Sequence, residues 1–499
     1  MRLYLGHALC VLAFTGLLVA GHAATPREAP IIGSKDFTAS IILGELLRLE
    51  ASRQGLKLDH RRAMGGSAIL WQALRVGSID AYPEYTGTLT QELLAQLPHP
   101  VSIEALAQAL SELGLAMSSP LGFEDRYALG VPEALAQRLG LRTISDLRAH
   151  PTLRFALSNE FMSRADGWLG LRAAYGLSPM TVRGLDHSLA YHALGQGVAD
   201  VTDVYTTDPE VDAEHLRVLD DDRNFFPSYQ AVWLYRLESA QRWPVLESSI
   251  QALAGHVSLS EMRSLNAQVQ FQRRPESSVA AQFLSTTSPR EQGWGRRLAQ
   301  RTREHLVLVG VSLGLALGLG LPLGVAAAKA PRFGRAVLGL TVVLQTIPSL
   351  AMLVFMIPLL GIGALPAIAT LFLYSLLPIV RNTMVGLSSL PAELITSAAS
   401  LGLPWQVQLL RIELPLAGRT ILAGISTAAV IDVGTATLGA LIGAGGYGEP
   451  ILTGIRLNDV PLILEGAVPA AAMALLVMGL FQWLEYLVTP RGLRLRIDA

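Results

Sequence analysis

The chain has 499 residues, too many for one ordinary domain, and 51% of them are hydrophobic. Lys and Arg number 39 against 40 Asp and Glu, so the net charge of −1 gives no electrostatic support for nucleic-acid binding. The single cysteine excludes an intramolecular disulfide framework and a cysteine cluster for metal. Charged residues become sparse after position 305. Composition therefore predicts a soluble part followed by a membrane part.

The first residues are typical of a targeting signal. Arg2 precedes the apolar run 9–20, and the sequence GHAATP then offers small residues for cleavage after Ala23. We expect a signal peptide at 1–23, with an uncleaved membrane anchor as the alternative. Either one would place the following residues outside the cytoplasm.

Residues 30–284 alternate short apolar segments with amphipathic ones. PIIGSKDF indicates a strand that runs into a helix, and AILWQALRVGSIDAYPEY indicates a helix followed by a strand. This alternation predicts an α/β domain with its ligand site in loops at the strand ends. The stretch AYPEYTGT places Tyr82 and Tyr85 three residues apart, where they serve either as packing residues or as a ring surface for a cation.

The polar segment 285–304 lacks a strong apolar period, so we interpret it as a linker. Five apolar candidate membrane spans follow, at 306–328, 336–360, 364–380, 416–443 and 461–488. We therefore expect an all-α polytopic domain of about five helices at 305–488, and a cytoplasmic tail at 489–499. The fourth span contains Asp432, which we expect to face either the cavity of a dimer or a polar partner rather than lipid, because an unpaired charge in a bilayer is costly.

The orientation follows from the charges between the spans. If the α/β domain is outside, the connections 329–335 and 381–415 and the tail lie inside, which agrees with the positive-inside tendency. Arg296, Arg297, Arg301 and Arg303, next to the first span, oppose this orientation. The connection 381–415 is helix-forming and too apolar to be a free loop, so it needs a partner surface.

This connection resembles the cytoplasmic coupling loop of ABC importer permeases. The family pattern is Glu-Ala-Ala, three residues, Gly, nine residues and Ile-x-Leu-Pro. Its positions fall here on Thr396, Ser397, Ala398, Gly402, Ile412, Leu414 and Pro415. Thr396 stands where the family has Glu, and Ser397 replaces the first Ala. The resemblance implies that a cytoplasmic ATPase subunit docks on this loop.

Longer runs resemble the osmoprotectant branch of these importers, which takes up glycine betaine, choline and carnitine. In the membrane half they include VGTATLGALIGAGGYGEPILTGI. The N-terminal half is similar to the periplasmic binding proteins of that branch, through GSKDFT, IDAYPEYTGT, GFEDRYAL, SNEFMSRADG, VYTTDPEV and LDDDRNFFPSYQAV. The resemblance implies a two-lobed, type II-like α/β binding protein fused to the permease subunit.

The same resemblance implies a box of tyrosine rings for a quaternary ammonium solute, formed by Tyr85, Tyr127, Tyr205 and Tyr229. A trimethylammonium has no N–H to donate, so ring faces suit it, at about 0.5 to 2 kcal/mol each. Tyr82 lies on the opposite face of the predicted strand from Tyr85, so we assign it to packing.

Further ligand residues are implied in the same way. Donors for a betaine carboxylate fall on Lys35, Thr88 and Arg164, and Asp125 falls near the cationic end. Arg164 suits a carboxylate because a guanidinium can donate two parallel hydrogen bonds. Its alternative is a surface arginine beside Asp166.

The chain has no nucleotide-binding P-loop, because its three lysines are followed by Asp36, Leu58 and Ala330. We therefore expect no catalytic residue and no cofactor in this chain, with ATP hydrolysed on a partner subunit. No metal-ligand spacing stands out, and we interpret His187 and His192 as surface or core histidines.

These features predict the substrate-binding and membrane-spanning subunit of an ATP-driven importer of quaternary ammonium osmoprotectants. We expect it in the bacterial inner membrane as a homodimer of the permease domain, with the binding domain on the periplasmic side. The alternatives are an amino-acid importer subunit, and a ligand-gated channel or sensor with an external binding domain.

Overall fold

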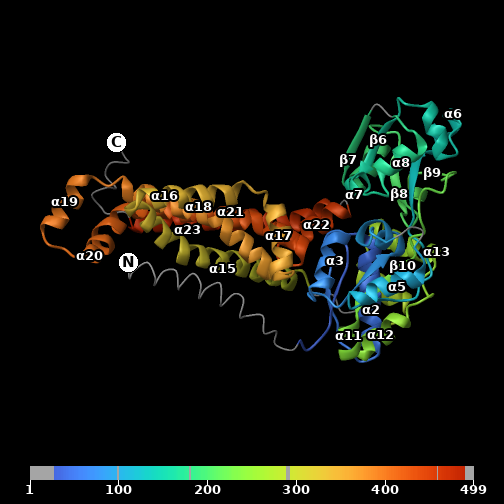
Figure 1. Ribbon diagram of the computed structural model, residues 1–499, viewed down its shortest axis with the longest axis horizontal. Helices are drawn as coiled ribbons and strands as arrows, with labels where there is room; N and C mark the ends of the chain where they lie inside the picture. Colours follow the sequence, from blue (N-terminus) through green and yellow to red (C-terminus); the bar gives the residue numbers. More distant parts are fainter. Residues whose placement is uncertain (1–26, 98–100, 179–180, 288–292, 458, 489–499) are drawn as a thin grey trace.

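The computed structural model describes residues 27–97, 101–178, 181–287, 293–457 and 459–488. The predicted signal peptide at 1–23 and the predicted tail at 489–499 lie outside these residues. The chain forms an α/β domain of two lobes and an elongated helical domain (Figure 1). The predicted fold class is confirmed.

Lobe one is built on a five-stranded sheet with the order β2-β1-β3-β10-β4. Strand β1 (Ile31–Gly33) pairs in parallel with β2 (Asp59–Arg61) and β3 (Ala81–Tyr85). Strand β10 (Ala231–Arg236) runs antiparallel to β3 and to β4 (Leu115–Met117). The other elements of this lobe are α2 (Thr38–Arg53), α3 (Ser67–Arg75), α4 (Thr86–Thr88), η1 (Leu89–Leu93), α5 (Ile103–Glu112), α11 (Leu237–Arg242), α12 (Pro244–Gln251), α13 (Leu259–Gln270) and α14 (Glu276–Phe283).

The sheet of lobe one has an apolar core on each face. Along β10, Trp233 packs into one core, and its neighbours Val232 and Leu234 pack into the other. Successive side chains of a strand point to opposite faces, so a strand that is covered on both sides is apolar at every position.

Lobe two contains a three-stranded antiparallel sheet, in which β5 (Tyr127–Pro132) lies between β8 (Thr202–Tyr205) and β9 (Leu216–Leu219). A parallel pair, β6 (Arg154–Ser158) and β7 (Thr181–Leu185), joins it through a bridge between Phe155 and Val201. The remaining elements are α6 (Glu133–Leu139), η2 (Ile144–Ala149), α7 (Asn159–Ser163), α8 (Trp168–Tyr175), α9 (His187–Gly195) and α10 (Glu210–Ala213).

The chain crosses between the lobes twice, and the two crossing segments pair with each other. Glu124 and Gln230 form an antiparallel bridge. Beside it, the Asp125 N–H donates to the Tyr229 carbonyl over 3.0 Å. Two paired crossings of this kind can act as a hinge, so Asp125 and Tyr229 are held where the lobes meet.

Among the residues that the structure describes, the helical domain has four helices that are long and apolar enough to cross a membrane, or up to five spans if one bent pair counts as a span. The bent pair is α16 (Pro331–Thr346) and α17 (Ser349–Leu360), which meet at 98° around Pro348. The other elements are α15 (Trp294–Lys329), α18 (Ala364–Ser388), α19 (Ala392–Ser400), α20 (Trp405–Gln408), η3 (Leu409–Glu413), α21 (Leu414–Thr435), η4 (Ala436–Ile442), α22 (Gly448–Arg456) and α23 (Val460–Val488). The predicted number of about five spans agrees with this result.

Helix α15 begins at Trp294, so the second half of the predicted linker 285–304 is helical. The polar side chains of this part contact the ends of other helices, which explains why its pattern lacks an apolar period. Arg301 donates to Glu465 over 2.6 Å, and Thr302 shares a 2.7 Å hydrogen bond with the Tyr447 hydroxyl. Glu465 also lies 3.8 Å from Arg297. An acidic partner thus offsets two of the arginines that oppose the predicted orientation.

Two features of the third and fourth spans bear on the sequence predictions. Helix α18 continues past the predicted end at 380 to Ser388. Asp432 of α21 is fully buried and accepts a 2.7 Å hydrogen bond from the Ser375 hydroxyl of α18. Its expected polar partner is therefore present.

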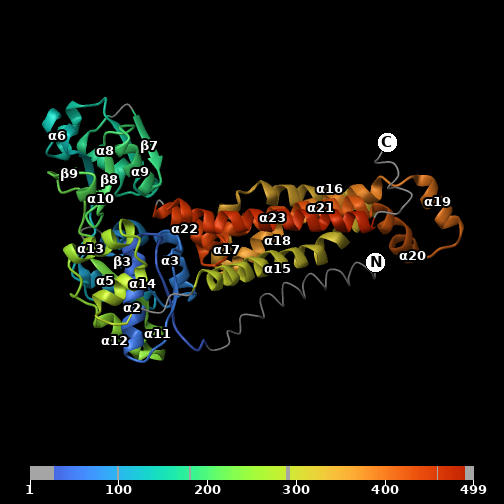
Figure 2. The same cartoon turned by 180° about the vertical axis from the view of Figure 1, so that it is seen from behind.

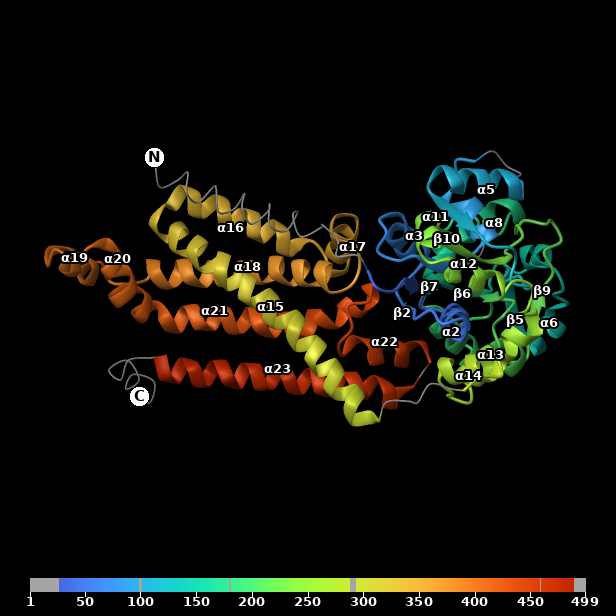
Figure 3. The same cartoon turned by 90° about the horizontal axis from the view of Figure 1, so that it is seen from below.

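The α/β domain lies at one end of the helical bundle, beside α17 and α22, and α19 and α20 lie at the opposite end (Figures 2 and 3). Lobe one makes the contact. Ile362, between α17 and α18, packs against a core of lobe one, and Arg273 pairs with Asp459 at 3.3 Å. If the bundle crosses a membrane, the α/β domain and the predicted coupling loop face opposite sides.

Candidate ligand-binding site

A cavity of about 570 Å³ lies between the two lobes and reaches the end of the helical domain. Its walls come from the loop after β1, the end of β3, the crossing segments and the end of β8. All predicted ligand residues except Arg164 line it: Lys35, Tyr85, Thr88, Asp125, Tyr127, Tyr205 and Tyr229. Loops at strand ends hold the ligand in many α/β proteins.

The predicted tyrosines come from both lobes and from the hinge. Tyr127 and Tyr205 are register partners on β5 and β8, and their ring centroids are 4.8 Å apart. The Tyr229 ring stands edge-on to Tyr127 at 5.7 Å. Tyr85, at the end of β3, contributes a ring from lobe one. Tyr85 packs against the lobe-two core that contains Tyr127 and Tyr229, so rings of both lobes meet at the cavity.

Tyr82 has the role that strand alternation predicts. It is fully buried in a core of lobe one together with Leu234 of the neighbouring strand. It does not line the cavity that Tyr85 lines. The assignment of Tyr82 to packing is confirmed.

The cavity wall is rich in acidic side chains. Asp125 is buried and accepts a 2.7 Å hydrogen bond from the Thr207 hydroxyl. Burial and the nearby Asp208 raise the pKa of Asp125 to about 6. Asp36, Glu160 and further carboxylates also line the cavity, so its surface favours a cation.

His187 and Asp208 also line the cavity, although sequence reasoning did not select them. The His187 ring lies 4.5 Å from the Tyr205 ring, and its Nε2 is 2.9 Å from Asp208. Burial lowers the pKa of His187, but Asp208 and Asp203 outweigh it and raise this pKa well above its usual range. Asp208 also accepts the Tyr205 N–H over 2.8 Å and so holds that tyrosine in place. The motif VYTTDPEV could have indicated the contact between Asp208 and Tyr205, because Asp208 follows Tyr205 by three residues in a turn.

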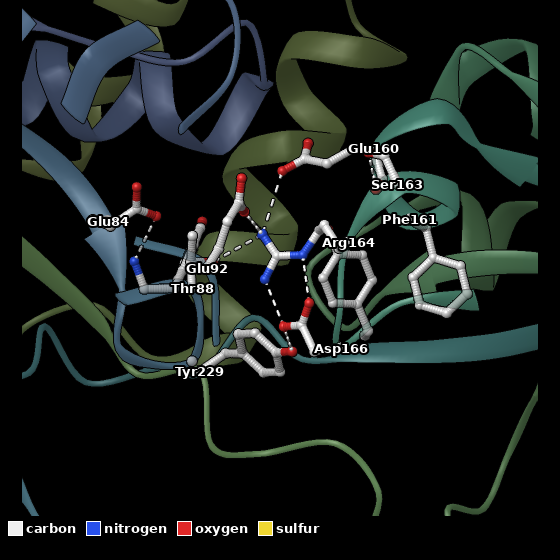
Figure 4. Close-up of polar contacts among 12 residues, drawn as sticks. Glu84, Thr88, Glu92, Glu160, Phe161, Ser163, Arg164, Asp166 and Tyr229 are labelled. Carbon is white, nitrogen blue, oxygen red and sulfur yellow. Dashed lines mark hydrogen bonds and ion pairs between the residues drawn. The ribbon is translucent and has the colours of Figure 1, made fainter. Parts of the chain in front are cut away.

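Arg164 does not line the cavity and lies among carboxylates (Figure 4). Its Nε and one Nη donate to Asp166 over 2.8 and 2.6 Å, and the other Nη donates to Glu92 over 2.6 Å. That Nη also lies 3.4 Å from the Thr88 hydroxyl and 3.6 Å from Glu160. Glu92 and Thr88 belong to lobe one and Arg164 to lobe two, so the guanidinium connects the lobes.

Lys35 is paired as well. Its ammonium forms a buried ion pair with Glu84 and lies 5.1 Å from the centroid of the Tyr85 ring. Both cations that the sequence predicts for a ligand carboxylate are thus occupied by acidic side chains of the protein. Their role toward a ligand stays a prediction. Among the described residues no cluster of three His, Cys, Asp or Glu is placed to hold a metal.

The predicted coupling residues lie at the far end of the helical domain. Thr396, Ser397 and Ala398 are in α19, and Gly402 makes the turn to α20 with a φ of +68°. Around this turn Leu401 and Trp405 are 78% and 63% exposed. Ile412, Leu414 and Pro415 lie where η3 continues into α21. A surface of large exposed apolar side chains needs a covering partner.

The loop is anchored to the first span. Glu413 is buried, and both of its oxygens accept hydrogen bonds from the Lys329 ammonium, over 2.8 and 2.6 Å. Lys329 is the last residue of α15, so a displacement of the loop would also move the end of that helix.

Comparison with known families accounts for nearly all of the described chain. Residues 31–286 match the family described as the substrate binding domain of ABC-type glycine betaine transport systems. Residues 320–493 match the family of binding-protein-dependent transport system inner membrane components.

Similar proteins cover the two parts differently. The carnitine transport permease protein OpuCB of Listeria monocytogenes is 41% identical over 201 residues, which are 40% of this chain and 92% of that protein. The choline transport system permease protein OpuBB of Bacillus subtilis is 37% identical over 213 residues, or 43% of this chain and 95% of that protein. The ergothioneine transport permease/ergothioneine binding protein EgtU of Helicobacter pylori is 29% identical over 280 residues, 55% of this chain and 51% of that protein.

Among solved structures, a glycine betaine/carnitine/choline ABC transporter chain is 30% identical, with a TM-score of 0.45, and covers 51% of this chain and 97% of that one. The family matches and the permease relatives lead to one assignment. The chain belongs to the ABC-type glycine betaine transport family, with the substrate-binding domain and the inner-membrane component in a single polypeptide.

Proposed function

We propose that this chain binds a quaternary ammonium osmoprotectant, such as glycine betaine, choline or carnitine, and forms the membrane path of its ATP-driven import. The observation that carries the proposal is the interlobe cavity, which combines four tyrosines with an excess of carboxylates. A methylated ammonium is weakly hydrated and has no N–H, so ring faces and diffuse negative charge suit it better than directed acceptors do.

The binding step uses the hinge between the lobes. Tyr85 lies on lobe one, Tyr127 and Tyr205 on lobe two, and Tyr229 between them. A ligand that contacts all four stabilises the closed arrangement over the open one, because only closure brings the four rings together. Asp125, paired with the Tyr229 backbone, adds a carboxylate at the same point.

The membrane step requires partners. A homodimer of the helical domain supplies the path, and a separate ATPase subunit docks on 392–415. The exposed Leu401 and Trp405 support this docking, as does their place at the end of the bundle away from the α/β domain. The α/β domain then faces the periplasm, and ATP-driven movement of the loop turns the cavity of the dimer from the inner to the outer side.

Titration of the purified full chain in detergent tests the ligand class. We expect saturable heats with at least one of glycine betaine, choline, carnitine and ergothioneine, and none with histidine or methionine, which carry no methylated nitrogen. Ergothioneine is included because EgtU bears its name and is described as both permease and binding protein. Binding of the plain amino acids alone would favour an amino-acid importer instead.

Copurification tests the transport class. An importer subunit retains an ATPase subunit through its cytoplasmic loop, and uptake in vesicles then depends on ATP. A channel or sensor with an external binding domain would bind the same ligand without an ATPase partner.

A further inference from the structure

Part of the wall of the ligand cavity comes from the helical domain. Leu441, Leu452, Ile455 and Arg456 line the cavity that the tyrosines line. Arg456 is the last residue of α22, the short helix that lies against lobe one in Figure 3. The cavity is therefore closed by residues of both domains.

Arg456 joins the two domains through its two Nη groups, while its third donor, the Nε–H, has no hydrogen-bond partner among the described residues. One Nη donates to the Thr38 hydroxyl over 2.7 Å, and the other donates to Glu276 over 2.8 Å. The side chain is only 13% exposed, and its Nε has no hydrogen-bond partner among the described residues. A buried donor without a partner is unfavourable. A ligand oxygen in the cavity would satisfy it.

The charges around Arg456 leave room for an anion. Glu276 is shared between Arg456 and Arg62, which lies 2.6 Å from its second oxygen. Burial raises the pKa of Glu276, but Arg62 and Arg456 outweigh it and hold this pKa at about 2. Arg62 also lies 3.7 Å from Glu45, whereas Glu276 is the carboxylate paired with Arg456. Burial raises the pKa of nearby Asp36, so Asp36 opposes an anion less than an exposed aspartate would.

The other cations near the cavity are engaged. Lys35 is paired with Glu84, His187 with Asp208, and Arg164 with Asp166 and Glu92. Two nitrogens of these described groups are buried without a hydrogen-bond partner, the Arg456 Nε and the His187 Nδ1. The His187 Nδ1 lies 3.7 Å from the Asp203 carboxylate, which leaves the Arg456 Nε as the donor for a ligand oxygen.

We propose that Arg456 is a ligand-binding residue contributed by the membrane domain, and that it takes the carboxylate of a zwitterionic quaternary ammonium solute. This inference rests on the function proposed above. The tyrosines hold the methylated ammonium, and Arg456, with the Thr38 hydroxyl beside it, holds the other end. The full site for a betaine then exists only while the two domains are docked, and the ligand already touches the membrane domain before it leaves the lobes.

The test compares two arginines that both join the domains. Arg456 lines the cavity, whereas Arg273 pairs with Asp459 outside it. Glycine betaine and choline are titrated into the full chain in nanodiscs, for wild type, Arg456→Gln, Arg456→Lys and Arg273→Gln. We expect Arg456→Gln to weaken betaine about tenfold and choline less than twofold. Arg273→Gln should leave the ratio of the two affinities unchanged.

The outcomes separate the site from the docking contact. Equal losses of betaine and choline in Arg456→Gln, or no loss of either, would overturn the inference, because the arginine would then serve docking alone. If Arg456→Gln does not fold, Arg456→Lys decides: it keeps the charge that faces Glu276 but has no Nε–H, so betaine must still weaken more than choline. A wild-type chain that binds neither ligand would refute the proposed function, whereas normal wild-type binding with an unchanged ratio would refute this inference alone.

Discussion

Tyr127 and Tyr205 face each other across paired strands, with ring centroids 4.8 Å apart and hydroxyls 3.2 Å apart. Each is fixed independently of a ligand: Tyr127 by its place at the start of β5, and Tyr205 by its N–H bond to Asp208. This half of the box is therefore pre-formed within lobe two. Tyr85 supplies the lobe-one ring and packs against the core that contains Tyr127.

Pre-formed ring faces lead to the first prediction. Replacement of Tyr85, Tyr127, Tyr205 or Tyr229 by Phe should weaken choline binding less than replacement by Ala, which removes about 0.5 to 2 kcal/mol per ring. The difference should be smallest at Tyr229, because its hydroxyl donates to Asp166 and Phe loses that bond too. Tyr235→Phe, a tyrosine of lobe one that does not line the cavity, serves as the control. Equal losses for Phe and Ala at all four positions would reject ring-face binding.

The second prediction concerns Arg164. Its guanidinium already binds Asp166 and Glu92, so Arg164→Ala leaves two carboxylates unpaired and removes an interlobe contact. We expect glycine betaine and choline affinities to fall by similar factors, and the melting temperature to fall because a buried pair is broken, at a cost of about 3 to 5 kcal/mol. Isothermal titration and thermal unfolding measure both. A loss confined to betaine would instead place the ligand carboxylate on Arg164, as the sequence predicts.

The third prediction concerns pH and Asp125, whose pKa burial and Asp208 raise to about 6. Above that pH the carboxylate is charged and attracts the cation, so choline affinity should fall as the pH is lowered from 7.5 to 5. Glu210 also lines the cavity with a pKa raised to about 7, whereas His187 stays protonated across this range. Asp125→Asn should therefore reduce the pH dependence without abolishing it. An unchanged profile would assign the effect to the other cavity carboxyl groups with raised pKa values, which are Asp36, Glu92, Glu160 and Glu210.

The raised pKa of Asp125 has the opposite effect on the stability of the ligand-free protein: here a lower pH is favourable. A carboxyl whose pKa is raised in the folded state stabilises that state while it is protonated. This contribution is present below the unfolded value of 3.8 and is lost as the pH rises through about 6. Thermal unfolding without ligand should therefore show Asp125→Asn gaining stability over wild type at pH 7.5 and less at pH 5.

Local patterns account for what the sequence predicted well. The alternation of apolar segments indicates an α/β domain, whereas its two lobes were implied by the family resemblance, and a strand-end tyrosine such as Tyr85 follows from the period of a strand. The opposite faces of Tyr82 and Tyr85 follow in the same way. These properties depend on neighbours in the chain.

Charge pairing depends on residues far apart, and the sequence did not reveal it. Lys35 and Glu84 are 49 positions apart, Arg164 and Glu92 are 72 apart, and Arg456 and Thr38 are 418 apart. A free lysine or arginine and a neutralised one look the same in a single sequence, because burial and partners are set by the folded chain. The polar start of α15 was missed for the same reason, since Glu465 and Tyr447, which its side chains contact, are remote.

The last prediction concerns the turn between α19 and α20. Gly402 has a φ of +68°, a region that costs other residues about 1 to 2 kcal/mol, and no atom lies within 4 Å of where its Cβ would be. A substitution there therefore strains the backbone and places a side chain on the exposed surface beside Leu401, without disturbing a core. Gly55, in the α/β domain, has a φ of +84° and equally open surroundings, so it is a matched control.

Gly402→Asp should leave ligand binding intact while it abolishes uptake and loosens the ATPase subunit, because it adds strain and a charge to an apolar docking surface. Gly55→Asp carries the same strain and charge at the other end of the molecule, and we expect it to transport normally. Ligand titration, ATP-dependent uptake in vesicles and copurification of the ATPase measure the three properties separately. If Gly402→Asp is expressed, retains its ATPase and still transports, then 392–415 is not the docking element, and the coupling path through Glu413 and Lys329 loses its starting point.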